Sequence, residues 1–163
     1  MVTKEMLVGV ELFEGQPDDI LDSVAAMCQH VSFAQGTTIF GVGQPADRIY
    51  LLLEGTVRLS ISATPLPEPV TITILQTSGQ AFGWSAVMGS GHYTTSAHAV
   101  TDVRAIAVEG NTLVNYLIET PCTGFEVMRR IAQVMSRRLG AMRKLLLETV
   151  IDYEKPAQAT AEN

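Results

Sequence analysis

Residues 31–57 read VSFAQGTTIFGVGQPADRIYLLLEGTV, a series of short apolar runs separated by turns that contain glycine, proline or aspartate. Runs of this length, rich in Val, Ile, Phe and Tyr, are typical of β-strands. The pattern continues in three further runs, TVRLSI (56–61), VTITIL (70–75) and VRAIAV (103–108). Short strands with such frequent turns favour a β-sandwich or roll over βαβ units. We therefore expect a β-roll over about residues 31–109.

Helical patterns flank the predicted roll. Before it, Pro17 and the aspartates that follow begin an apolar pattern of helical spacing, which runs to about Gln29. After it, a short helix is predicted over 111–119, and a long helix over about 121–153.

These elements predict the fold class and the domain organisation. The class is mainly β with helices (α+β): a double-stranded β-helix, or jelly roll, with an N-terminal helix and a long C-terminal helix. We assign residues 1–153 to this single domain. The small and polar residues 154–163 are expected to form a disordered tail.

The long helix carries an apolar heptad pattern, which is typical of a helix that packs on a partner helix. We expect a homodimer through the residues of this pattern: Phe125, Met128, Met135, Leu139, Met142 and Leu146. A second apolar stripe, formed by Ile131, Val134 and Leu145, could pack on the roll of the same chain.

The charge of the chain argues against a general affinity for nucleic acid. The formal net charge is −6 and the pI is near 5.0. However, the window Arg129–Lys144 holds six of the 11 basic residues and no acidic residue. This window is either a solvated helix face or a contact surface for an acidic protein partner.

Other features bear on the compartment. Cys28 and Cys122 both fall in helical patterns, so we expect reduced, packed thiols. No apolar run approaches the ~20 residues of a membrane span. The first residues lack a small-residue cleavage site typical of a secretory signal. We expect a cytoplasmic protein without membrane contact.

Residues 82–99, FGWSAVMGSGHYTTSAHA, contain the candidate ligand site. Gly83 has no Cβ, so its backbone can approach a ligand closely. The following residues, Trp84 to Val87, can form one helical turn whose free N–H groups would face an anion.

The glycine pattern resembles the cyclic nucleotide-binding domain family, known from catabolite activator proteins and from protein kinase A regulatory subunits. The resemblance covers about residues 12–150. Its motifs are Val31-x-Phe33-x-x-Gly36-x-x-Ile39-Phe40-x-x-Gly43-x-x-Ala46-Asp47-x-x-Tyr50, Glu54-Gly55-x-Val57 and Gly79-x-x-Phe82-Gly83.

The resemblance also shows where this chain departs from the family. The family cassette has a glutamate that accepts the ribose hydroxyl and an arginine that pairs with the cyclic phosphate. Trp84 and Tyr93 stand at these two positions. A hydrogen bond to a charged group contributes roughly 1.5–3 kcal/mol, so losing both removes about 3–6 kcal/mol, or roughly two to four orders of magnitude in affinity.

Two interpretations of the cassette follow. In one, the pocket is rebuilt around a cyclic nucleotide or a related anionic ligand, which would contact Gly83, Trp84, Ser85, Ala86, Tyr93, Thr94 and Thr95. His98, Arg137 or Arg138 could then supply a charge. In the other, Trp84 and Tyr93 fill the pocket. No cofactor is expected with either, and no metal, because His30, His92 and His98 lack the spacing of a metal site.

These interpretations correspond to two functions. The first is a sensory module that transmits ligand occupancy through its long helix to a second copy or a protein partner. The second is a dimerisation or interaction module without a ligand. No arrangement of catalytic residues is recognisable, so we expect no enzyme activity. Transcription factors of the family carry a DNA-binding segment after this helix. About ten residues follow Tyr153, so we expect no DNA binding by this chain.

Overall fold

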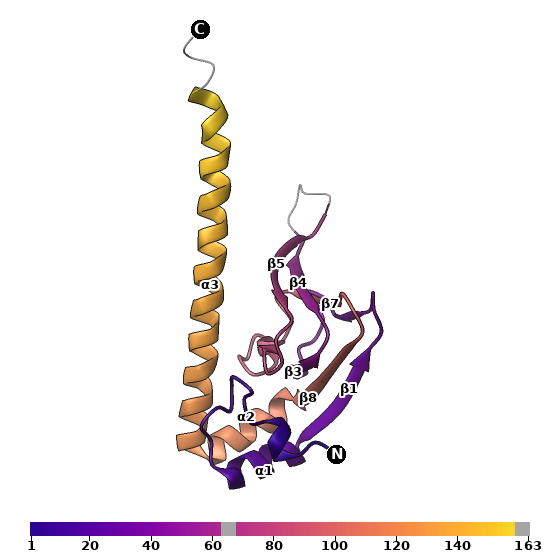
Figure 1. The fold of residues 1–163 in the computed structure, drawn as a ribbon. Coiled ribbons are helices and arrows are strands. Elements are labelled where there is room, and N and C mark those ends of the chain that lie inside the picture. The colour runs from indigo at the N-terminus through magenta and orange to yellow at the C-terminus, as the bar shows by residue number, and fades with distance from the viewer. Residues whose placement is uncertain (63–67, 159–163) are drawn as a thin grey trace. The chain divides into compact units, whose positions relative to one another are not determined.

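The computed structural model describes the backbone of residues 1–62 and 68–158 (Figure 1). Side chains are described up to Lys144 and at Leu147. The chain divides into two compact units, Met1–Ile131 and a second unit that begins at Ala132.

Two four-stranded antiparallel sheets form the first unit's roll. The first sheet has the order β1 (Cys28–Phe33), β8 (Val103–Glu109), β3 (Arg48–Glu54) and β6 (Ala81–Phe82). The second has the order β2 (Thr38–Phe40), β7 (Ser96–Ala99), β4 (Val57–Ile61) and β5 (Val70–Leu75). The predicted jelly roll is confirmed.

The helices are α1 (Asp18–Ala26), α2 (Gly110–Glu119) and α3 (Pro121–Gln158), with short 3₁₀ turns at η1 (Lys4–Met6) and η2 (Trp84–Ala86). The N-terminal and long C-terminal helices are therefore both present. Helix α3 continues past the predicted end at residue 153 and includes 154–158, which the sequence predicted as tail. Residues 159–163 of that predicted tail lie outside the described residues.

The cysteine prediction needs two corrections. The first helix ends at Ala26, and Cys28 begins β1, because it pairs with Val108 of β8. Cys28 is half-buried, and this burial raises the pKa of its thiol to about 12. Cys122 does lie in a helix, but it is exposed rather than packed.

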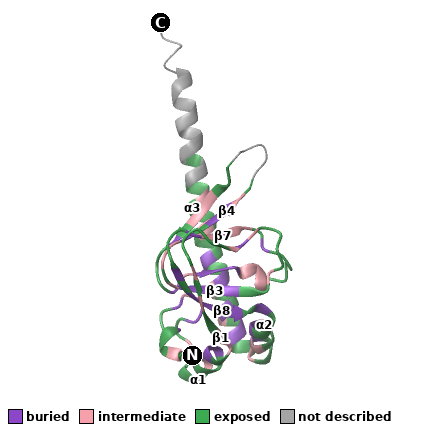
Figure 2. Ribbon diagram, turned by 90° about the vertical axis from the view of Figure 1, so that its right-hand side faces the viewer, coloured by how far each residue is buried: buried purple, intermediate pink, exposed green. Residues whose placement is uncertain are grey.

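Strands β3 and β8 are buried on both faces, which explains their nearly continuous apolar sequences (Figure 2). Successive side chains of a strand point to opposite faces. Ile49 and Ile106 therefore join a core cluster on the helical side, whereas Tyr50 and Ala105 join a second cluster between the two sheets. The first sheet thus separates two cores.

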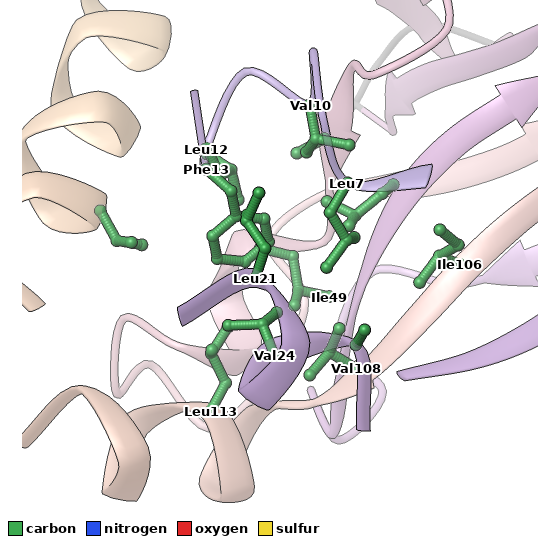
Figure 3. Close-up of a cluster of buried hydrophobic side chains, with 14 of the residues drawn as sticks. Leu7, Val10, Leu12, Phe13, Leu21, Val24, Ile49, Ile106, Val108 and Leu113 are labelled. Carbon is green, nitrogen blue, oxygen red and sulfur yellow. The ribbon is translucent and has the colours of Figure 1, made fainter. Parts of the chain in front are cut away.

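The helical-side cluster holds the N-terminal segment in place (Figure 3). Leu7, Leu12 and Phe13 are at most 1% exposed, although the sequence assigned no element to residues 1–16. The segment is also hydrogen-bonded to the roll, since the N–H of Glu11 donates to the carbonyl of Gly79 at 3.2 Å. Val10 of the same segment is also labelled, and the remaining labelled side chains come from α1, α2, β3 and β8.

Replacing Gly55 with alanine should destabilise the fold more than the same change at Gly36. Both have left-handed φ angles, +98° and +83°, which cost a residue with a Cβ about 1–2 kcal/mol. A Cβ at Gly55 would also lie 2.2 Å from the carbonyl oxygen of Asp102, whereas nothing lies within 4 Å at Gly36. Urea unfolding should show a loss of about 3–5 kcal/mol for Gly55→Ala and about 1–2 kcal/mol for Gly36→Ala. Equal losses would contradict this packing.

Candidate functional site

The cassette over residues 82–99 connects β6 to β7 and contains the predicted helical turn, as η2. Gly83 precedes this turn with a φ of +81°. A Cβ there would lie 3.0 Å from the carbonyl oxygen of Arg48 and 3.3 and 3.4 Å from the rings of Tyr50 and Phe40. The space that the missing Cβ leaves at Gly83 is therefore taken up by the start of β3 and by two aromatic rings.

Four aromatic rings gather in the interior of the roll next to Gly83: Phe40, Tyr50, Phe82 and Tyr93. Tyr93 stacks on Phe40 with ring centroids 3.8 Å apart and an angle of 13° between the planes. Phe40 in turn stacks on Tyr50 at 5.9 Å. Tyr93 is only 4% exposed, so it occupies the interior.

The hydroxyl of Tyr93 is bound to the start of β3. It donates to the carbonyl oxygen of Arg48 at 2.8 Å and accepts from the N–H of Arg48 at 3.2 Å. A carboxylate oxygen of Asp47 lies 3.4 Å away. Burial raises the pKa of Tyr93 well above its usual range, so it is a neutral phenol at neutral pH. Tyr93, predicted to stand at the position of the family's arginine, therefore supplies no charge there.

Trp84 and Tyr93, which the sequence resemblance predicts at the two charged anchor positions, do not come together. Trp84 is half-buried and packs against the helical-side cluster, whereas Tyr93 belongs to the cluster between the sheets. Trp84 therefore does not fill the interior of the roll.

The other cassette residues are more accessible. Ser85, Ala86 and Thr95 are half-buried and Thr94 is exposed. Neither threonine hydroxyl has a hydrogen-bond partner among residues 1–62 and 68–158. The carbonyl of Ser85 accepts a bond from the Ser90 hydroxyl at 3.3 Å.

His98, Arg137 and Arg138 were predicted as possible replacements for the missing charges. Ala97 and Ala99 of β7 face the roll interior, so His98 between them faces outward. There it contacts the Thr38 hydroxyl at 3.1 Å. Arg137 and Arg138 lie on α3 in the second unit. Within the part of the chain that the structure describes, no three His, Cys, Asp or Glu side chains gather as a metal site.

The cassette is packed tightly against α2. A Cβ at Gly110, the first residue of α2, would lie 2.2 Å from the carbonyl oxygen of Ala86. Val87 is buried in the same cluster as Leu113 and Leu117 of α2. A shift of the cassette turn must therefore displace the start of this helix.

The heptad residues of α3 that are described are accessible. Phe125 and Leu139 are 68% and 67% exposed, and Met128 and Met135 are 39% and 44% exposed. Met142 is half-buried, and the side chain of Leu146 lies outside the described residues.

The chain belongs to the cyclic nucleotide-binding domain family, whose pattern matches residues 30–119. It is 29% identical over 135 residues to the CRP-like cAMP-activated global transcriptional regulator of Mycobacterium tuberculosis, covering 83% of this chain and 58% of that protein. The chain thus spans little more than half the length of that relative.

Solved structures share the fold. A candidate cyclic nucleotide-binding protein from Geobacter metallireducens is 30% identical with a TM-score of 0.75, and the match covers 85% of this chain and 99% of that one. The catabolite activator protein of Thermus thermophilus is 26% identical with a TM-score of 0.68, and the match covers 86% of this chain and 62% of that one. These similarities indicate a domain of the type found in ligand-sensing regulatory proteins.

No helix among the described residues carries an apolar stretch long enough to cross a bilayer.

Removal of the Tyr93 hydroxyl should destabilise the protein. Tyr93→Phe keeps the ring but leaves the Arg48 backbone without its partner, which costs about 1–3 kcal/mol in urea unfolding. Tyr116→Phe is the matched control, because that tyrosine is half-buried and its hydroxyl has no partner among the described residues. The control should change stability by less than about 0.5 kcal/mol. If the two variants were equally stable, Tyr93 would not be anchored to β3.

Proposed function

We propose that this chain is a ligand-sensing regulatory module that transmits occupancy of its cassette through α2 to α3, and from there to a second copy or a protein partner. The observation that carries the proposal is the packing of the cassette turn on α2. Because the carbonyl of Ala86 occupies the space next to Gly110, the turn and the helix must move together.

The ligand we propose is a cyclic nucleotide or a related anion held by the neutral part of the cassette. The hydroxyls of Thr94 and Thr95 and the N–H of Ser85 can donate hydrogen bonds to it, whereas the N–H groups of Ala86 and Val87 already donate within the turn. Because neither family charge is present, we expect cyclic AMP to bind roughly two to four orders of magnitude more weakly than a site with both charges. We assign no catalytic role and no DNA contact to this domain, and we place it in the cytoplasm.

The alternative is an interaction module without a ligand. The burial of Tyr93 favours it, because that ring fills part of the roll interior. This alternative also predicts that Trp84 fills the interior. However, Trp84 packs against the helical-side cluster. The similarity to a cAMP-activated regulator also weighs against it.

Ligand binding should reduce hydrogen exchange in α2. With cyclic AMP, cyclic GMP or a cyclic dinucleotide at about 5 mM, we expect slower exchange over residues 110–119 and a change in the fluorescence of Trp84, the chain's single tryptophan. The amides of strand β4 should show the same hydrogen exchange with and without the ligand. A panel without any effect on either signal would favour the interaction module.

Thr94→Val and Thr95→Val test whether the neutral cradle holds this ligand. Each removes one donor, and we expect the affinity to fall about fivefold or more. Thr37→Val is the matched control, since this exposed threonine lies in the turn between β1 and β2. An equal loss in the control would show that the cradle is not the binding site.

The predicted homodimer is tested by Leu139→Asp. A carboxylate in an apolar helix interface is poorly solvated, so sedimentation at micromolar concentration should change from dimer to monomer. Leu147→Asp is the matched control, because Leu147 is 57% exposed and lies outside the heptad pattern. A wild-type protein that is already monomeric would overturn the dimer.

A further inference from the structure

A second candidate site lies at the start of β3, where two cavities meet. One has a volume of about 400 Å³ and the other of about 380 Å³. Both are lined by Asp47 and Arg48, so these two residues lie at their common border. Cavities of a few hundred Å³ suit a small molecule.

The two cavities differ in chemistry. The larger one is polar, with Gln29, Glu109 and Thr112 in its wall. The smaller one is lined, apart from Gln44 and the shared Asp47 and Arg48, by apolar and aromatic residues: Ile39, Phe40, Pro45, Tyr50 and Tyr93. A ligand that spans both needs a charged part and an apolar part.

The register of the first sheet explains this arrangement. Arg48 and Tyr50 are two residues apart on β3, so both point to the face that lines the roll interior. On β8, Glu109 is opposite Arg48 and Ala107 is opposite Tyr50. The small side chain of Ala107 leaves space beneath the charged pair, which is where the polar cavity lies.

The charged side chains are available to a ligand. The guanidinium of Arg48 forms no ion pair or hydrogen bond within the described part of the chain, although Glu109 is its cross-strand neighbour. Asp47 and Arg48 are both exposed. Glu109 accepts one bond, from the hydroxyl of Thr112 at 2.8 Å.

The charge balance selects the ligand class. Two carboxylates and one guanidinium line the site, so its charge at neutral pH is negative. This disfavours a phosphate dianion but suits a molecule with one cationic and one anionic group. We propose that the site binds a zwitterionic α-amino acid with an apolar side chain. Its carboxylate pairs with Arg48, its ammonium group with Asp47 or Glu109, and its side chain enters the aromatic-lined cavity.

This site goes beyond the proposed function, because its charged groups lie at the start of β3 and the end of β8, and Tyr93 is the one cassette residue that lines it. It holds whether or not a nucleotide binds at Thr94 and Thr95. The two proposals can therefore fail separately.

The test is calorimetry and amide NMR of the full chain with phenylalanine as the probe. We expect saturable binding at millimolar concentration or below, with shifts at residues 47–50 and 107–109. Two truncated probes are the comparison: 3-phenylpropionate, which lacks the ammonium group, and phenethylamine, which lacks the carboxylate. Each should bind about tenfold more weakly or worse. Equal binding of either truncated probe, or no binding of phenylalanine at about 10 mM, would overturn the proposal.

Arg48→Gln locates the site. Because the Arg48 side chain is exposed and lacks a partner among the described residues, the variant should unfold at the wild-type urea midpoint. Phenylalanine affinity should fall about tenfold. Arg58→Gln is the matched control, since Arg58 is an exposed arginine on the outer face of β4. A similar loss in both variants, or no loss in Arg48→Gln, would contradict the assignment.

Discussion

The stacking of Tyr93 on Phe40 is the contact on which the cassette depends. The ring joins the cassette to β2, and its hydroxyl joins the cassette to β3 through the backbone of Arg48. Four small residues, Ala97, Ala99, Ala105 and Ala107, line the same interior and leave room for the rings. This part of the interior is therefore occupied by a neutral side chain whose hydroxyl both donates to and accepts from the β3 backbone.

This contact changes what the cassette needs in order to fold. An arginine at this position would place a guanidinium in a largely apolar interior, where a charge is costly unless an anion accompanies it. Tyr93 needs no such anion, because the protein backbone satisfies its hydroxyl. The cassette can thus keep its contact with Gly110 and α2 in the absence of a ligand. A ligand that binds here therefore meets a cassette that is already ordered, and its binding is not needed to order the cassette.

Sequence patterns predicted the roll, both flanking helical regions and the turn at Trp84, because alternation and glycine-marked turns are local signals. Sequence patterns did not predict that Trp84 and Tyr93 pack in different cores. Which core a side chain enters depends on packing between strands that are distant in the sequence. The end of the first helix was also misplaced. Cys28 fits a helical pattern, but pairing with β8 decides its conformation. The assignment of RIYLLLE to a strand was the available signal for the shared face of Arg48 and Tyr50, because residues two apart in a strand point to the same side.

Proton NMR of the free protein, with assigned aromatic rings, tests the position of Tyr93 most directly. The centroid separation of 3.8 Å requires strong nuclear Overhauser contacts between the rings of Tyr93 and Phe40. The Tyr93 hydroxyl should also exchange slowly with water, because it is buried and bonded to Arg48. A Tyr93 ring without contacts to Phe40 and with a rapidly exchanging hydroxyl would show that the interior is open, and would contradict the closed cassette.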